Sequence, residues 1–146
     1  MPRRSDVEPG QALEPYIVES VSPEPMKTMA AILQDPNPIH YDVDSVRSLG
    51  LGDRPINQGP SNLGYLIELV VRFAGGREAL LGVRARFLGN VFAGERVECT
   101  GVVAAVDADA GVAHLDLAAT SDGRPVLTGQ ARIALQQDAS AADSGV

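Results

Sequence analysis

The chain has 146 residues, 45% of them hydrophobic and 21% charged, and this composition excludes a protein that is disordered throughout. Its 19 acidic residues outnumber the 12 basic ones, and the net charge of −7 argues against nucleic acid and anionic membranes as partners. No apolar run approaches the roughly 20 residues that a membrane-spanning helix needs. The one cysteine, Cys99, cannot form an intramolecular disulfide and fits a reducing compartment. We therefore expect a single cytoplasmic domain.

Both ends of the chain are polar and rich in small or charged residues. Residues 1–10 and 136–146 show no apolar periodicity, so we expect two disordered tails around a folded domain at 11–135. Neither an internal repeat nor a linker interrupts that range, which leaves no place for a second domain to begin.

The first part of the predicted domain is a strand followed by a helix. The strand is expected near Leu13–Val18, and Ser-Pro-Glu at 22–24 has the cap, first-turn proline and first-turn acid of a helix start. This helix must end near Gln34, because Pro36 and Pro38 disfavour the helical conformation of the residues that precede them. The two prolines therefore predict a stiff, extended bend directly after the helix.

Two further helices are predicted after the bend. A short one runs from Asp42 or Asp44, acids suited to cap it, as far as Leu49. A long one covers 61–74 and ends at Gly75-Gly76. Its apolar residues recur at helical spacing on one face and continue beside it, so we expect this helix to be buried. The face consists of Leu63, Leu66, Ile67, Val70, Val71 and Ala74, with Tyr65, Leu69 and Phe73 beside it.

From Leu80 onward the hydrophobic period changes to two, which is typical of strands with one face in water. We expect four antiparallel strands, and Asp122-Gly123 suits the positive φ angles of a tight hairpin between the last two. The whole pattern predicts an α+β architecture in which a curved antiparallel sheet wraps one long helix. The strands are marked by Val83, Ala85 and Phe87, by Val97 to Val106, by Ala113, Leu115, Leu117 and Ala119, and by Leu127, Ala131, Ile133 and Leu135.

The bend after the first helix carries an acid, an amide and an imidazole: Asp35, Asn37 and His40. Its prolines fix φ at two positions, and a stiff loop can hold catalytic groups in place. From the residues alone, a catalytic Asp–His pair and a structural turn network are both open interpretations. A metal site of His40, Asp42 and Asp44 is a third, although no further His or Cys joins them and helix capping explains both acids.

Asp-Pro-Asn-Pro-Ile-His-Tyr-Asp at 35–42 resembles the Asp-x-Asn-Pro-Ile-His-x-Asp signature of MaoC-like (R)-specific enoyl-CoA hydratases. The resemblance continues through the short helix and glycine turn at 46–52 and through Pro-Ile-Asn-Gln-Gly at 55–59, where the family has Pro-Ile-Ala-His-Gly. Phe-Leu-Gly-Asn-Val-Phe-Ala-Gly-Glu at 87–95 is similar to the family's Phe…Pro-Val…Gly-Asp segment. Together these motifs cover residues 20–105. They imply a single hot-dog domain, in which a curved antiparallel sheet wraps a long central helix.

The resemblance also implies a reaction, the addition of water to a 2-enoyl thioester or its removal from an (R)-3-hydroxyacyl thioester. Asp35 and His40 match the residues that hold one water, deliver its hydroxyl group to C3 and supply the proton at C2. Asn37 would orient this pair, and the backbone N–H of Gly59, near the start of the long helix, would stabilise the oxyanion. No metal and no cofactor is expected, because acid–base groups serve this chemistry and the CoA or acyl-carrier thioester is the substrate.

Polar residues around these positions are candidates for substrate binding. The sequence departs from the family at Gln34 and at Asn57-Gln58, so the pocket wall is expected to be rich in amides. Arg84 and Arg86 are candidates for contacts with the CoA phosphates, and outward-facing strand charge is the alternative. The full set is Gln34, Asn57, Gln58, Asn62, Tyr65, Arg84 and Arg86, with an ordinary loop or surface role as the alternative for each.

Other functional interpretations stay open at this point. A hot-dog thioesterase would act on the same thioester, and a non-catalytic acyl-binding subunit would keep the fold without the chemistry. The sheet edge that a single hot-dog unit exposes favours a homodimer. His114 alternates with apolar neighbours and is expected to face solvent, and nothing in the sequence around Cys99 marks it as an activated thiol.

Overall fold

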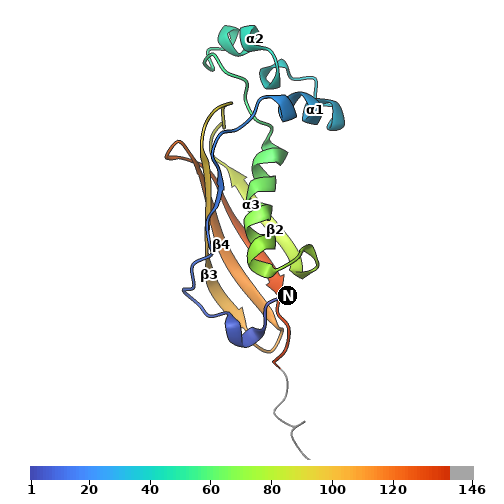
Figure 1. Ribbon diagram of the computed structural model, residues 1–146, viewed down its shortest axis with the longest axis vertical. Helices are drawn as coiled ribbons and strands as arrows, with labels where there is room; N and C mark the ends of the chain where they lie inside the picture. The colour runs from blue at the N-terminus through green and yellow to red at the C-terminus, as the bar shows by residue number, and fades with distance from the viewer. Residues whose placement is uncertain (139–146) are drawn as a thin grey trace, which may run out of the picture.

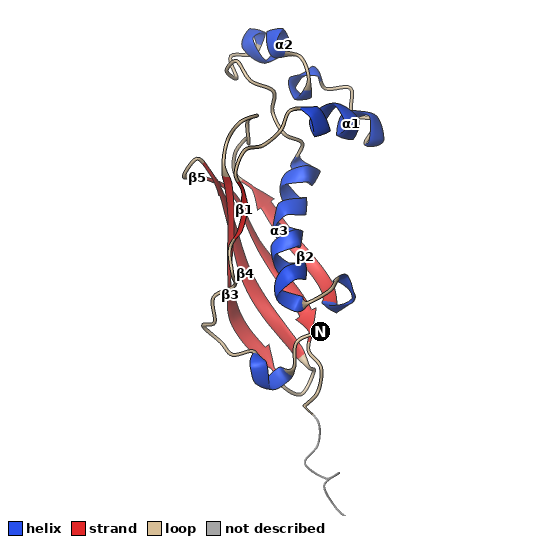
Figure 2. Cartoon of the chain, in the orientation of Figure 1, coloured by secondary structure: helices blue, strands red, loops and turns tan. Residues whose placement is uncertain are grey.

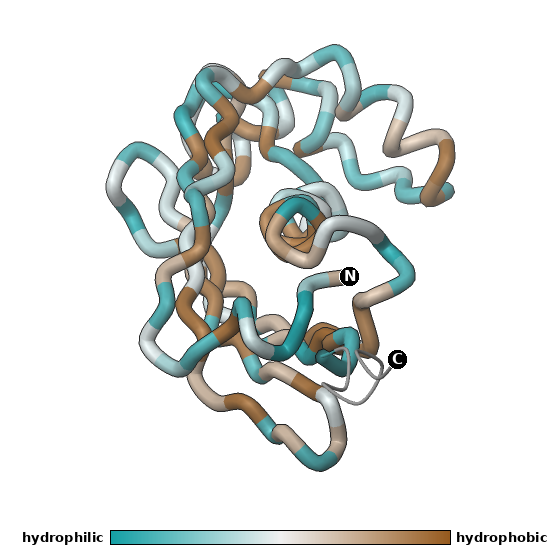
Figure 3. The backbone as a smooth tube through the Cα atoms, turned by 60° about the horizontal axis from the view of Figure 1, so that its bottom comes forward, coloured by the Kyte–Doolittle hydropathy of each residue, from teal (hydrophilic) through white to brown (hydrophobic). Residues whose placement is uncertain are grey.

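The computed structural model describes residues 1–138, which form a curved antiparallel sheet around one long helix (Figure 1, Figure 2). Figure 3, in which the long helix is seen nearly end-on, shows the strands curving around one side of it. The strands are β1 (Tyr16–Val18), β2 (Leu80–Phe87), β3 (Val97–Asp107), β4 (Val112–Ser121) and β5 (Arg124–Ala134). The α-helices are α1 (Glu24–Ile32), α2 (Val43–Ser48) and α3 (Gly59–Ala74), and the 3₁₀ helices are η1 (Arg4–Asp6), η2 (Pro38–His40) and η3 (Arg77–Ala79). The predicted hot-dog arrangement is confirmed.

The five strands follow the order β1-β3-β4-β5-β2, and all neighbouring pairs are antiparallel. Asp122 and Gly123 connect β4 to β5 with φ angles of 46° and 80°, which confirms the predicted tight hairpin. The order leaves β1 and β2 at the two edges of the sheet. Because β1 has only three residues and β2 has eight, β2 is the long unpaired edge of a single chain.

The hydrophobic core lies between α3 and the inner face of the sheet. One face of α3 is fully buried there, but the other predicted apolar positions are only half-buried, so the expectation of an all-round buried helix is wrong for a single chain. The reason is geometric, because the sheet curves around only one side of the helix. The buried residues are Leu66, Leu69, Val70 and Ala74, and the half-buried ones include Leu63, Ile67 and Val71. No helix within the described part of the chain is both long and apolar enough to cross a bilayer.

The N-terminal segment is part of the folded domain, which corrects the prediction of a disordered tail at 1–10. Val7 is buried in the core, and the Arg4 N–H donates to the Gln136 carbonyl over 2.9 Å. Ser5 N–H also donates to the side chain of Asp138 over 3.0 Å. These contacts are long-range, so a local absence of periodicity did not reveal them. Of the predicted C-terminal tail, residues 139–146 lie outside the described part.

Helices α1 and α2 lie beyond the N-terminal end of α3 and away from the body of the sheet (Figure 1). The structure confirms the predicted cap of α2, because the Asp42 carboxylate accepts hydrogen bonds from Asp44 N–H and Ser45 Oγ. The hydrogen bond from Ser45 lowers the pKa of the Asp42 carboxyl group. The bend between α1 and α2 carries the motif residues, so this overhanging segment positions the candidate site.

Candidate active site

The bend begins where the last turn of α1 closes. Gln34 adopts a left-handed conformation with φ of 51°, which is uncommon for a residue other than glycine. The next N–H, that of Asp35, donates to the Ala30 carbonyl over 3.0 Å and so satisfies the helix end. Gln34 itself is exposed. Its conformation turns the chain so that Asp35 follows the helix directly.

Asp35 and His40 face each other across the bend, which confirms that a loop can bring these two residues together. Asp35 Oδ2 lies 3.2 Å from His40 Nε2, and Asp35 Oδ1 accepts the Asn37 N–H over 3.1 Å. The His40 side chain is 8% exposed and that of Asp35 is 37% exposed. The pair is therefore anchored on its imidazole side and open on its carboxylate side, where water and a substrate can reach it.

A backbone carbonyl fixes the orientation of the imidazole ring. His40 Nδ1 lies 2.6 Å from the Ile56 carbonyl oxygen, and because a carbonyl only accepts, Nδ1 carries the proton that is donated. A neutral ring then presents its lone pair at Nε2, directly toward Asp35. Atoms 3.2 Å apart leave no room for a water between them, so a water that both groups hold must lie beside the pair.

The side chain of Asn37 acts on the bend and makes no hydrogen bond to the Asp35 or His40 side chain. Its Oδ1 accepts the Ile39 N–H over 3.3 Å and caps η2, while its backbone N–H orients the Asp35 carboxylate. Tyr41 also stabilises the bend, because its hydroxyl group donates a hydrogen bond to the Pro36 carbonyl over 3.2 Å. The predicted orienting role of Asn37 thus corresponds to a backbone contact and a local cap.

Gly59 is the first residue of α3, where N–H groups have no partner within the helix. Pro60 follows it and has no N–H, and Ile56, which holds His40, precedes it by three residues. A Cβ atom on Gly59 would lie 3.3 Å from Cε1 of Phe87, a tight contact. This helix start is therefore connected to the Asp–His pair through a short stretch of backbone, and it offers a donor at the positive end of the helix dipole.

The amide residues around Gly59 form hydrogen bonds within the protein. Asn57 Nδ2 donates to Asn62 Oδ1 over 2.8 Å and to the Tyr65 hydroxyl oxygen over 3.2 Å. Gln58 Nε2 donates to the Met26 carbonyl over 2.7 Å and so joins the start of α3 to α1. Asn57, Gln58 and Asn62 are buried, and burial raises the pKa of Tyr65. The hydrogen bonds of these residues stabilise the chain around the start of α3, whereas Gln34 is exposed to solvent.

Arg84 and Arg86 lie on the sheet face opposite α3. Both arginines border a hollow of about 410 Å³ there, and Arg84 also borders a second hollow of about 460 Å³; Asp35 and His40 line neither hollow. His114 lines the second hollow and is exposed, as predicted. The structure thus does not bring the two arginines together with Asp35 and His40 in a single chain. The hollow of about 460 Å³ is lined by Gly82, Val83, Arg84, Ala104, His114, Leu115, Asp116, Gln130, Ala131 and Arg132.

The other candidates from the sequence have structural explanations. Asp42 caps α2, and within residues 1–138 no three His, Cys, Asp or Glu side chains are grouped closely enough to hold a metal ion. Cys99 is buried in β3, and this burial raises the pKa of its thiol to about 12. A thiol that stays protonated at neutral pH is a poor nucleophile.

Part of the site is built from backbone groups, which the side-chain pattern of the sequence did not reveal. The Ile56 carbonyl anchors His40, and an isolated bridge pairs Ile56 with Phe92. A carbonyl group leaves no side-chain signal in a sequence. The only available indication was the similarity at 55–59 and 87–95, which marked both segments without showing that they pair.

We predict that neutral His40 exists as the tautomer with its proton on Nδ1. Long-range ¹H–¹⁵N NMR checks this, because the chain has only two histidines and a His114→Gln variant assigns their signals. The expected spectrum has a pyrrole-type Nδ1 and a pyridine-type Nε2 for His40. A pyrrole-type Nε2 would contradict the hydrogen bond to Ile56.

Comparisons with known proteins identify the family of this chain and proteins of similar fold. A family profile described as "MaoC like domain" matches residues 5–121. The structure is similar to the (R)-hydratase from A. caviae involved in PHA biosynthesis, with 25% identity, a TM-score of 0.79, and coverage of 89% of this chain and 98% of that one. It is also similar to R-hydratase PhaJ1 from Pseudomonas aeruginosa, with 20% identity, a TM-score of 0.78, and coverage of 92% and 85%.

A third similar structure is the ChsH1-ChsH2 complex from Mycobacterium tuberculosis, with 17% identity, a TM-score of 0.76, and coverage of 88% of this chain and 98% of that one. A search of curated protein sequences found no match. The family profile covers most of the chain, including the Asp–His bend and the start of α3. The chain therefore belongs to the MaoC-like domain family.

Proposed function

We propose that this protein adds water to a 2-enoyl thioester, or removes it from the corresponding (R)-3-hydroxyacyl thioester. The observation that carries the proposal is the Asp35–His40 pair, held 3.2 Å apart on a stiff bend beside the start of α3. The similarity to the A. caviae (R)-hydratase at 25% identity supports the same class of reaction. CoA or an acyl carrier is the proposed thioester partner, and we propose no metal or redox cofactor.

The proposed mechanism assigns each group a proton or a charge. In the neutral imidazole ring, Nδ1 donates its proton to Ile56, and Nε2 takes a proton from a water that Asp35 also holds. The water oxygen bonds to C3, the C2–C3 π electrons move toward the thioester carbonyl, and the enolate oxygen accepts the Gly59 N–H. The pair then returns a proton to C2. The net change is the addition of one water with no oxidation or reduction.

Substrate contacts outside this centre are part of the same proposal. The candidates are the exposed Gln34, the amide side chains of Asn57, Gln58 and Asn62, and the hydroxyl group of Tyr65. Arg84 and Arg86 remain the candidates for the phosphates of the carrier, on the opposite face of the sheet. An assay with crotonyl-CoA that follows both enoyl absorbance and free thiol separates hydration from thioester hydrolysis and from simple binding.

We predict that Asp35→Asn and His40→Gln each lower kcat for hydration by about 100-fold or more, because each removes one partner of the water. The double variant should be little worse than either single one, since the two residues act as a unit. Circular dichroism and Tm serve as the folding control. Turnover like that of the native protein in either folded variant would remove the mechanism.

A second prediction tests the oxyanion donor. Gly59→Val should lower kcat/KM by roughly 100-fold, comparable to the loss of one oxyanion-hole donor, because the new side chain crowds both the carbonyl site and Phe87. Gly64→Val is the matched control, since Gly64 lies on the same helix and a Cβ there meets open space. Undiminished hydration by folded Gly59→Val protein would show that the carbonyl is held elsewhere.

We also propose that the active form is a homodimer whose sheets join along β2. This strand is the long free edge, and exposed apolar residues accompany it: Leu81, Phe87 and Leu88 are 48%, 52% and 49% exposed. The half-buried side of α3 adds apolar surface in the same chain. An antiparallel pair of β2 strands would satisfy the free backbone groups and cover these side chains.

Light scattering at micromolar concentration is expected to give the mass of two chains. Leu81→Glu should shift the equilibrium toward monomer, because it introduces a charge beside the joining edge. Leu49→Glu is the control, since Leu49 is an equally apolar and exposed residue on the α2 segment. A stable monomer for the unmodified protein would contradict the dimer.

A further inference from the structure

We propose that the ion pair between the buried Glu95 and the exposed Arg124 positions His40 for the hydration reaction, acting through a pair of backbone segments. Neither residue is part of the Asp35–His40 centre, and Glu95 and Arg124 are thus positioning residues. The inference rests on the proposed function for its kinetic consequence. The structural claim, that this ion pair helps to hold His40 in place, rests only on the hydrogen bonds described below.

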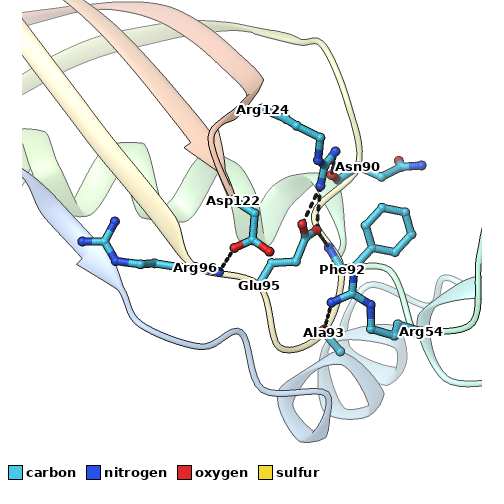
Figure 4. Close-up of polar contacts among 8 residues, drawn as sticks. All are labelled: Arg54, Asn90, Phe92, Ala93, Glu95, Arg96, Asp122 and Arg124. Carbon is cyan, nitrogen blue, oxygen red and sulfur yellow. Dashed lines mark hydrogen bonds and ion pairs between the residues drawn. The ribbon is translucent and has the colours of Figure 1, made fainter.

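Glu95 is an unusual residue in this protein, because its carboxylate is buried at 2% residue exposure. Arg124 Nη2 donates to both oxygens of Glu95, over 2.8 Å and 2.6 Å, and the arginine comes from the start of β5 (Figure 4). Oε1 of Glu95 also accepts the Phe92 N–H over 2.7 Å. A buried charge is costly unless it is fully paired, and an apolar residue of similar size often stabilises as well. The carboxylate therefore needs an explanation beyond packing.

The loop that Glu95 holds is paired with the segment before α3. Ala93 N–H donates to the Pro55 carbonyl over 2.9 Å, and Asn57 N–H donates to the Val91 carbonyl over 2.8 Å. These two bonds flank the bridge between Ile56 and Phe92. The Glu95 carboxylate fixes the position of the Phe92 backbone, and the backbone hydrogen bonds between the two segments couple the position of Ile56 to that of Phe92.

Ile56 in turn holds the bend on both sides of the imidazole. Its N–H donates to the Ile39 carbonyl over 2.9 Å, and its carbonyl accepts His40 Nδ1–H over 2.6 Å. Apart from His40, no side chain of the bend makes a long-range hydrogen bond to the rest of the domain within residues 1–138. A shift of Ile56 would therefore move the ring of His40 relative to Asp35.

Two arginines strengthen the same loop. The guanidinium carbons of Arg54 and Arg124 lie 5.5 Å and 5.7 Å from the centre of the Phe92 ring, and Arg54 Nη1 donates to the Ala93 carbonyl over 3.2 Å. Figure 4 shows these side chains gathered around the loop. Directional bonds of this kind fix position more narrowly than apolar packing, and a displacement of about 1 Å can cost about 100-fold in rate.

Glu95→Gln is the variant that isolates the ion pair. It keeps the size of the side chain and an oxygen that can accept the Phe92 N–H, but it removes the charge that Arg124 binds. Glu98→Gln is the matched control, because it breaks an ion pair with Arg96 three residues along the same segment, where both side chains are partly exposed. Arg124→Lys keeps the buried carboxylate paired and replaces two-oxygen contact with a point charge.

Two measurements are made on each variant, the Nδ1–H proton resonance of His40 and the kinetics of crotonyl-CoA hydration. In Glu95→Gln the resonance should shift and exchange faster with water, and kcat should fall about tenfold with KM changed less than about threefold. Arg124→Lys should give smaller changes in the same direction. It replaces Glu95→Gln as the test if the Glu95→Gln protein fails to fold. Glu98→Gln should leave both quantities unchanged.

A native His40 resonance in folded Glu95→Gln or, failing that, in Arg124→Lys would overturn the proposal. Equal changes in Glu98→Gln would overturn it as well, because the effect would then be one of charge in general. A loss of kcat with an unchanged resonance would exclude His40 as the group that is positioned. If the native protein hydrates no enoyl thioester, the proposed function fails, while the resonance still decides whether the ion pair holds His40.

Discussion

The hydrogen bonds between the backbone of Ile56 and the bend at His40 are the constraint on which the candidate site depends. Ile56 binds both the Ile39 carbonyl and the imidazole Nδ1–H, so one residue sets both the position of the bend and the tautomer of the ring. Helices α1 and α2 lie beyond the N-terminal end of α3 (Figure 1). Without these hydrogen bonds, the two prolines would stiffen only the bend itself. They would not fix the imidazole ring relative to the rest of the domain.

The same short segment links the two halves of the proposed chemistry. Ile56 orients the imidazole, and Gly59 begins α3 three residues later with a free first-turn N–H group. One stretch of chain thus holds the imidazole ring and supplies the oxyanion donor, and this stretch is paired with the loop at 91–93. The buried amides of Asn57 and Gln58 fasten this stretch to α3 and α1, which limits independent motion of the two halves.

Local patterns were sufficient to predict the elements. The change of hydrophobic period at Leu80, the prolines of the bend and the Asp122-Gly123 turn each act within a few residues, and the structure agrees with them. The N-terminal ten residues were predicted wrongly, because Val7 is buried by contacts with distant parts of the chain. The burial of α3 was overestimated for a similar reason, since periodicity does not reveal that the sheet covers only one side.

For the site, short local motifs in the sequence were enough to name the reactive groups, because Asp35 and His40 belong to the motif at 35–42 and Gly59 to the one at 55–59. The tertiary structure decided what those groups can do. It placed Asp35 and His40 at 3.2 Å, assigned the imidazole proton through the Ile56 carbonyl, and separated Arg84 and Arg86 from the pair onto the opposite sheet face. Backbone carbonyls and strand pairing carry no side-chain signature, so only the folded chain shows which peptide group meets which ring.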